Sequence, residues 1–274
     1  MRLEVIRRGR GGLRTHSHRR WPTRNSGVRA MSTQQYSLIR KLYISQPREM
    51  LLDLSALQRI GISSQRAASY AKNGWLNRIA HGLYAFPETE PSLCAGFSYL
   101  TRQIAGLHIG GDSVLGTVCE DDVAPLVLWG DSRASLPRWF VERYPVRYVH
   151  ARLFDWSGAP TLGTATLERQ AGLLRSTRER ALLEMLYEVS CSHDLLKARD
   201  RFCAVGDVCS LTSGRLLQHC TSVKAVRLFL RLARQAQSLD VDELLGRWRV
   251  HTGSERRWIA RLKDGTTLCL GPRG

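Results

Sequence analysis

The sequence has no run of about 18 apolar residues, the length that a membrane-spanning helix needs, so no membrane association is expected. It also has no Cys-x-x-Cys pair. Its seven cysteines are odd in number and scattered, which argues against a disulfide framework or a zinc site and fits a reducing cytoplasm. We therefore expect a cytoplasmic protein that needs no metal or other cofactor.

The motifs of common enzyme classes are absent too. The chain contains no GxxxxGK[ST], GxGxxG, HExxH or GxSxG pattern, so we predict no catalytic residue. Asp155 and the later Glu168-Arg169-Gln170 loosely imitate the D…ExQ spacing of metal-dependent nucleases, a pattern that often arises by chance. A nuclease that uses Asp155 and Glu168 is therefore only an alternative interpretation.

Lysine is scarce as well. It provides five of the 41 basic residues, so arginine carries nearly all of the net charge of +17 in this chain of 274 residues. Arginine forms bidentate contacts with phosphates and with guanine edges, and an arginine-weighted surface therefore favours a nucleic-acid partner.

The N-terminal segment distorts this charge balance. The first 30 residues hold nine arginines and one acid, Glu4, a net of +8 that leaves about +9 for the rest. The segment lacks the apolar core of a secretory signal, and its composition predicts a disordered basic tail over residues 1–32. The tail is either an upstream extension, with Met31 as the natural start, or an arm that touches DNA; a transit peptide also fits the composition.

Residues 55–86 carry the most informative pattern in the chain. They predict a helix, a tight turn, a second helix and a short β-hairpin, which is the order of a winged helix-turn-helix. A further helix is expected before them, over residues 36–45. The hairpin, or wing, would have strands at residues 75–76 and 82–86.

Capping residues mark the starts and ends of these two helices. Ser55 with Gln58 suggests a capping box for the first helix, and Gly61 suggests its left-handed end. Ser63 can cap the next helix and Gly74 can close it. That next helix is the predicted recognition helix, the one that enters the DNA major groove.

The recognition helix has a small-residue side and a polar side. Ala67, Ala68 and Ala71 are expected to pack inward. The polar side chains and two in the wing can donate to base edges or phosphates. These candidate DNA contacts are Ser64, Gln65, Arg66, Ser69, Lys72, Asn73, Arg78 and His81.

An acidic spacer, Pro87 to Pro91, is the best candidate linker. It predicts a winged helix over residues 33–90 and a larger mixed α/β domain over residues 91–274, so the fold class is α+β.

The second domain is expected to begin with a helix and to continue with strands, then helices. Ser176 with Glu179 suggests a capping box, and the chain then reads as mostly helical to about Leu245. A basic, strand-like finish follows, with turns at Gly253 and Asp264-Gly265. The expected first helix and the strand-like runs cover residues 92–104, 123–129, 146–153 and 167–175.

A second set of cations has helical spacing. It lies on one stripe at i, i+3, i+7 and i+10 without an acidic partner in register, and two further arginines could extend it. The set predicts either a second polyanion-binding face or a solvated face of a core helix. Its members are Lys224, Arg227, Arg231, Arg234, Arg256 and Arg257.

Together these segments resemble a known family, the AbiEi-type antitoxins of bacterial type IV toxin–antitoxin systems, which limit phage by abortive infection. The family's wing pattern is present as Gly74-Trp75-Leu76, Arg78, Gly82 and Tyr84. RERALLEMLYEVS and LLQHCTSVKAVRLFLRLA resemble two of its helices, and SERRWIARL its basic strand, although Glu255 departs from that pattern. The resemblance covers roughly residues 34–270.

The resemblance implies an antitoxin that represses its own operon by binding inverted repeats in promoter DNA. It also implies that the C-terminal domain counteracts an AbiEii-like nucleotidyltransferase toxin without forming a stable complex, in the cytoplasm and at the nucleoid. The second set of cations would then serve either this antitoxicity or DNA binding. It brings no catalytic residues. The alternative is a winged-helix transcriptional regulator whose C-terminal domain senses a ligand or partner.

Overall fold

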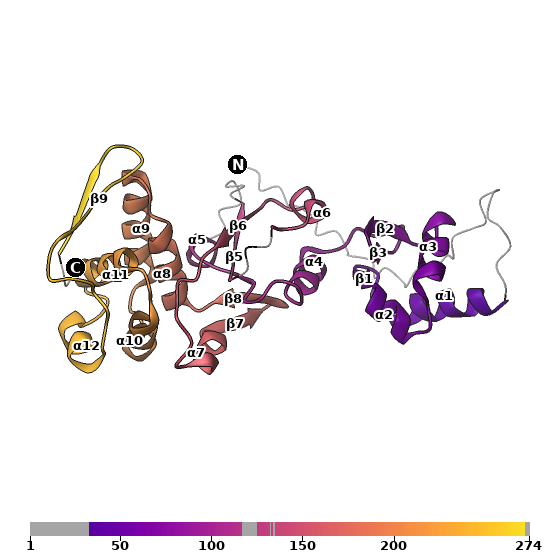
Figure 1. Ribbon diagram of the computed structural model, residues 1–274, viewed down its shortest axis with the longest axis horizontal. Coiled ribbons are helices and arrows are strands. Elements are labelled where there is room, and N and C mark those ends of the chain that lie inside the picture. The colour runs from indigo at the N-terminus through magenta and orange to yellow at the C-terminus, as the bar shows by residue number, and fades with distance from the viewer. Residues whose placement is uncertain (1–32, 117–124, 132, 134, 272–274) are drawn as a thin grey trace, which may run out of the picture.

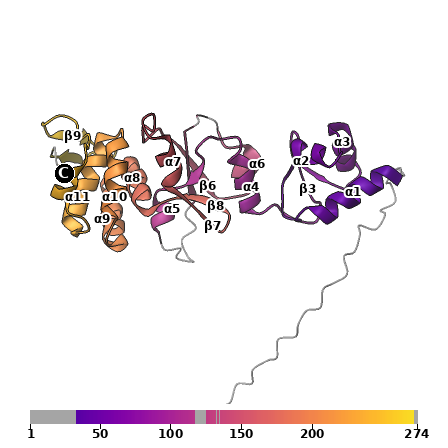
Figure 2. The ribbon, with the colours of Figure 1, turned by 90° about the horizontal axis from the view of Figure 1, so that it is seen from below.

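The computed structural model describes residues 33–116, 125–131, 133 and 135–271. The predicted tail over residues 1–32 and the start of the predicted strand at residues 123–129 lie outside the described residues. The molecule is elongated, with the N-terminal elements at one end and the C-terminal helices at the other (Figures 1 and 2). No helix in the described ranges is long and apolar enough to cross a membrane.

The N-terminal elements form a winged helix with its own core. In chain order they are α1 (Thr33–Ser45), β1 (Leu52–Asp53), α2 (Leu54–Arg59), α3 (Ser64–Lys72), β2 (Asn77–Ala80) and β3 (Leu83–Ala85). The three strands are antiparallel in the order β1-β3-β2. Buried side chains of all three helices and the sheet meet in the core, including Ile39, Leu57, Tyr70 and Phe86. The predicted fold class is confirmed.

Two local predictions for this domain are wrong. The cap of α2 is Asp53, whose carboxylate accepts from the N–H of Ala56 at 2.7 Å, while Ser55 donates its hydroxyl to Asp53. Asp53 reaches this position because it ends β1, a strand that the sequence did not predict. The first wing strand is Asn77–Ala80 rather than residues 75–76.

The middle of the chain is built on a mixed five-stranded sheet in the order β6-β5-β4-β8-β7. Its elements are α4 (Leu93–Leu100), β4 (His108–Ile109), α5 (Asp112–Leu115), β5 (Leu126–Gly130), α6 (Arg138–Val141), β6 (Val146–His150), α7 (Pro160–Ala165), β7 (Leu167–Gln170) and β8 (Leu173–Ser176). The single strand-like run predicted at residues 167–175 is a hairpin, because Ala171 and Gly172 turn the chain with positive φ.

The C-terminal part is helical and ends in a two-stranded hairpin. Its elements are α8 (Arg178–Glu188), α9 (Ser192–Val205), α10 (Ser210–His219), α11 (Val223–Ala236), α12 (Val241–Arg247), β9 (Trp258–Arg261) and β10 (Thr267–Leu270). Helices α8 and α11 pack together at the centre of the largest buried core. The predicted helical run to Leu245 is thus confirmed, as are the turns at Gly253 and Gly265, which have positive φ.

The predicted capping box at the start of α8 is wrong. Thr177 precedes the helix and makes no side-chain cap, and the hydroxyl of Ser176 instead donates to the buried Glu184 at 2.7 Å. Glu179 accepts from the N–H of Cys209 instead of closing a box. Ser176 donates to Glu184 because the oxygens of a buried carboxylate need hydrogen-bond donors.

The winged helix packs against the middle part of the chain, so the two are held together by more than the segment that links them. Leu51, Leu83 and Ala85 are buried against Tyr99 and Trp139. On the same side, an ion pair joins Arg102 of the middle part to Asp53 at 2.8 Å. The wing sheet is therefore covered on one face by the middle part, and its other face packs on the helices of the winged helix.

Candidate nucleic-acid interface

Helix α3 is fixed at its start by local interactions that the sequence predicts. The Oγ of Ser63 accepts a hydrogen bond from the N–H of Arg66 at 3.3 Å. Gly61 has a φ of +86°, so the chain can end α2 in a left-handed turn that favours glycine. Gly74 does the same after α3, with a φ of +77°. These three predictions are confirmed.

The inner face of α3 differs in part from the prediction. Ala67 and Tyr70 are buried and Ala71 is half-buried, but Ala68 is exposed. The reason is helical geometry: residues 67, 70 and 71 share a face, and residue 68 lies a further 100° around. Tyr70, and not Ala68, thus belongs to the buried face of α3.

The outer face of α3 carries most of the predicted contact residues. Four of the six have exposed side chains at i, i+1, i+5 and i+8, which lie on one side of a helix. They are Ser64, Gln65, Ser69 and Lys72. Arg66 and Asn73 are half-buried; the Arg66 guanidinium donates to the carbonyl of Gly61 at 3.4 Å, and Asn73 is the residue that ends the helix. They flank the exposed face instead of standing on it.

The wing places the other two predicted residues together. Arg78 and His81 are exposed, and a guanidinium nitrogen of Arg78 lies 3.3 Å from Nδ1 of His81. Gly82, with a φ of +70°, makes the turn between β2 and β3. Ile79 and Ala80 are partly buried and pack against the cluster of Leu51, Leu83 and Ala85. The polar tip of the wing is therefore held by an apolar base.

The chain segment that forms α3 and the wing carries charges of one sign. From Leu54 to Phe86 the sequence contains no aspartate or glutamate, whereas Arg59, Arg66, Lys72 and Arg78 lie within it. A surface with cations and no acids attracts phosphates without a competing internal partner.

The predicted cationic stripe on α11 is not a free face. Arg227 is 1% exposed and donates to four backbone carbonyls. Lys224 donates to the carbonyls of Tyr187 and Val189 at 2.6 and 2.8 Å, where α8 ends. Burial lowers the pKa of Lys224 despite the acids nearby. The expectation that these two side chains offer a solvent-facing surface is wrong.

The other members of the set are placed differently. Arg231 is half-buried with its guanidinium 3.5 Å from the carbonyl of Cys269, and Arg234 pairs with Asp242 of α12 at 2.6 Å. Helical spacing in the sequence can show only the partners within the same helix. It therefore did not predict the ion pair with Asp242, which lies on α12. Arg256 and Arg257 are exposed, in the segment before β9.

A cavity of about 690 Å³ lies between β5, α8 and α9. Its charged side chains are largely paired: Lys197 and Arg201 hold Asp112 at 2.6 and 2.9 Å, and Arg147 pairs with Glu188. Because these charges neutralise one another, the cavity does not favour a strongly charged ligand.

The residues of the nuclease alternative do not form a metal site. Asp155 accepts from the N–H of Ser157, and Glu168 lies 3.7 Å from Arg175. Among the residues that the structure describes, no group of three or more metal-ligating side chains exists.

The architecture is that of a winged-helix protein with a larger mixed domain behind it, and comparison with known proteins defines the family. Residues 124–268 match the family described as "Transcriptional regulator, AbiEi antitoxin, Type IV TA system". Residues 35–118 match its companion, "Transcriptional regulator, AbiEi antitoxin N-terminal domain". The chain therefore belongs to the AbiEi antitoxin family of transcriptional regulators from type IV toxin–antitoxin systems, as the sequence motifs predict.

A solved structure is also similar. The crystal structure of the RV2827C protein from Mycobacterium tuberculosis matches with a TM-score of 0.52 and 19% sequence identity. The match covers 85% of this chain and 90% of that chain. At this identity the likeness concerns the fold alone. No curated protein matches the chain.

Proposed function

We propose that this protein is a repressor that binds inverted repeats in the promoter of its own operon through α3 and the wing. The observation that carries the proposal is the exposed polar face of α3 beside the Arg78–His81 tip, in a segment without acids. In this arrangement α3 enters the major groove, where Gln65 can read adenine, and Lys72 and the wing hold phosphates.

The test is the affinity of the purified chain for its own promoter DNA, measured by fluorescence anisotropy at fixed salt. Gln65→Ala should cost about 1–3 kcal/mol and relax specificity at one base position, if this side chain reads a base. Lys72→Ala should weaken binding to all sequences and lower the salt dependence by about one phosphate contact.

Matched controls keep the same residue types away from the proposed interface. Gln218 on α10 and Lys41 on α1 are exposed, so Gln218→Ala and Lys41→Ala should leave affinity unchanged. Equal affinity of the Gln65→Ala, Lys72→Ala double variant and the parent would remove α3 from the contact.

We further propose that residues 91–274 counteract an AbiEii-like nucleotidyltransferase toxin encoded next to this gene, without a stable complex and without enzymatic activity of this chain. The family description as an antitoxin of a type IV system supports this role. The alternative is a winged-helix regulator whose second domain senses a ligand or partner.

Co-expression distinguishes the two. The antitoxin should restore growth of cells that express the neighbouring toxin, and the Gln65→Ala, Lys72→Ala variant should still do so when both genes are driven from foreign promoters. No rescue at matched expression would favour the alternative.

A further inference from the structure

The cavity between β5, α8 and α9 has an apolar floor. It is lined there by four members of the largest buried core, Val127, Met185, Val189 and Ala198. Its volume of about 690 Å³ lies in the range of sites that hold small organic molecules. Such sites are most frequent where two structural units meet, and this cavity lies where the five-stranded sheet meets the C-terminal helices. It therefore has the size and the place of a small-molecule site.

The three carboxylates that line the cavity already have partners. Asp112 pairs with two cations of α9, and Glu188 pairs with one cation of β6. Asp194 accepts hydrogen bonds from the N–H and the hydroxyl of Ser190 and from the N–H of Cys191. The ammonium group of a cationic or zwitterionic ligand would have to displace one of these contacts, so the cavity does not favour such a ligand.

One cation that lines the cavity has no such partner. Lys263 lies in the turn between β9 and β10, and its side chain is exposed. Two hydrogen bonds hold this turn at the start of α9: the N–H of Lys263 donates to the carbonyl of Ser190 at 2.8 Å, and the N–H of Ser192 donates to Asp264 at 2.6 Å. In the part of the chain that the structure describes, no carboxylate lies at ion-pair distance from the Lys263 ammonium group. This group is therefore available to an anion.

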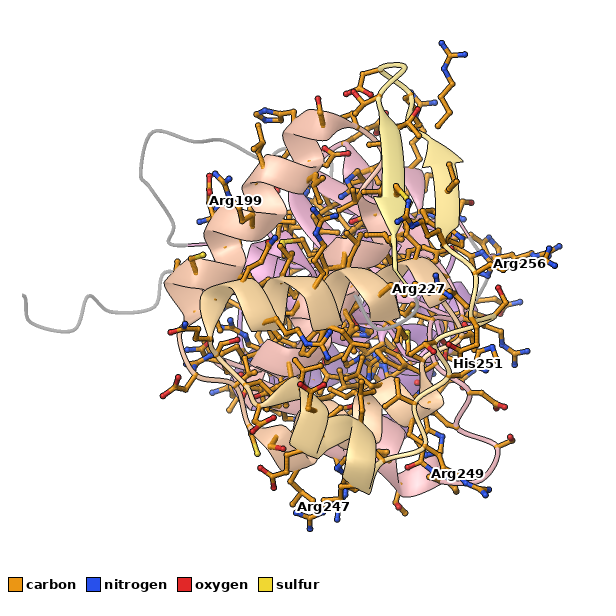
Figure 3. The ribbon with its side chains drawn as sticks, turned by 90° about the vertical axis from the view of Figure 1, so that its left-hand side faces the viewer. Arg199, Arg227, Arg247, Arg249, His251 and Arg256 are labelled. Carbon is orange, nitrogen blue, oxygen red and sulfur yellow. The ribbon has the colours of Figure 1, made fainter. Side chains whose placement is uncertain are left out.

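The charged border of the cavity faces solvent, and its floor does not. The side chains of Arg147 and Lys197 are each 47% exposed, whereas Met185 and Ala198 are buried. Figure 3 shows the β9–β10 hairpin beside α9, with Arg199 on the side of that helix that faces away from the hairpin. A ligand would thus lie with its charged group outward, at the hairpin turn, and its apolar part inward.

We propose that this cavity binds an amphipathic monocarboxylate, with its carboxylate on Lys263 and an aliphatic or aromatic body on the apolar floor. A single negative charge suits one free lysine, whereas a phosphate ester with two or more charges would also face the three carboxylates of the border. Burial of the apolar body drives binding. The site lies apart from α3 and the wing (Figure 1), so it does not depend on the proposed contact with promoter DNA.

The test is a titration of the full-length chain labelled with ¹³C at the methyl groups of its four methionines. Met185 lines the cavity, and the exposed Met50, next to the winged-helix sheet, is the internal reference. Loss of one signal in Met185→Leu assigns the resonance. The probes are octanoate and 2-naphthoate, with octan-1-ol and octylamine as the neutral and cationic counterparts of octanoate.

We expect the Met185 signal to shift saturably with at least one carboxylate, and the Met50 signal to stay in place. Octanoate should bind more tightly than octan-1-ol and octylamine. A shift with octanoate alone assigns an aliphatic body, a shift with 2-naphthoate alone assigns an aromatic one, and a shift with both shows that the floor accepts either.

Variants at the hairpin test the role of the lysine. Lys263→Ala should weaken carboxylate binding about two- to fivefold, the effect of losing one exposed ion pair. Arg261→Ala, which removes an exposed cation of the same hairpin that does not line the cavity, should leave the affinity unchanged. Lys263→Glu should reverse the preference, so that octylamine binds more tightly than octanoate.

Three results would overturn the proposal. The first is a Met185 signal that stays in place with both carboxylates up to their solubility limits. The second is equal affinity for octanoate and octan-1-ol, because the cavity would then take apolar molecules without recognising an anion. The third is parental affinity for octanoate in Lys263→Ala.

Discussion

At the scale of single residues, the central feature of the C-terminal part is the buried carboxylate of Glu184. It accepts from Nε2 of His108 at 2.8 Å, from Arg180 at 2.9 Å and from the N–H of Gly111 at 3.0 Å, besides the hydroxyl of Ser176. These donors join two strands, β4 and β8, and the start of α5 to α8 through one charge. Burial by itself would raise the pKa of Glu184, but the charges and hydrogen bonds of His108, Arg180 and Ser176 outweigh it and lower the pKa.

This network predicts acid sensitivity. The pKa of Glu184 is lower in the folded state than its ordinary value of 4.5, so its stabilisation is present above pH 4.5 and is lost as pH falls below that value. Urea unfolding of the parent and of Glu184→Gln should show a difference in unfolding free energy at pH 7 that shrinks progressively below pH 4.5. A difference that stays constant down to pH 3 would contradict this assignment.

At the scale of helices and strands, polar residues at element ends decide much of the packing. Lys224 on α11 reaches the last carbonyls of α8 and ties the two central helices together. A cation at the end of a helix also interacts favourably with the helix dipole. The side chain is thus a structural link, not an exposed part of a polyanion-binding face.

Lys224→Ala should therefore lower the unfolding free energy by about 1.5–3 kcal/mol, the range for hydrogen bonds that involve a charged group. It should leave the affinity for promoter DNA unchanged. Thermal unfolding and anisotropy together check this, with Lys197→Ala, which removes a half-exposed lysine from a surface ion pair, as the control of smaller effect. A variant with parental stability and reduced DNA affinity would reverse the assignment.

Sequence reasoning succeeded where the cause is local. Ser63 and Gly61 terminate helices through neighbours two or three residues away, so their roles were predictable. It failed where the cause is distant. Asp53 caps α2 only because β1 pairs with β3 some thirty residues later, and Arg227 is buried only because the segment before β9 folds over α11. Helical periodicity shows which side chains share one side of a helix, but not which side the rest of the fold covers.

At the scale of the whole molecule, the winged helix and the C-terminal helices lie at opposite ends of an elongated chain, with the five-stranded sheet between them (Figures 1 and 2). The face of the wing sheet that packs on Tyr99 and Trp139 fixes the winged helix against the middle part of the chain. The polar tip of the wing and the outer face of α3 remain exposed. This division suits the function proposed above, in which one end contacts promoter DNA and the C-terminal part counteracts the toxin.

The most direct test of the account is a footprint of the purified full-length chain on the promoter upstream of its own gene. We predict protection of two inverted half-sites in the same concentration range in which anisotropy shows binding, and loss of that protection in the Gln65→Ala, Lys72→Ala variant but not in Gln218→Ala, Lys41→Ala. A promoter left uncovered by the folded parent, or one covered equally by both variants, would contradict the claim that α3 and the wing form a repressor's DNA-binding face.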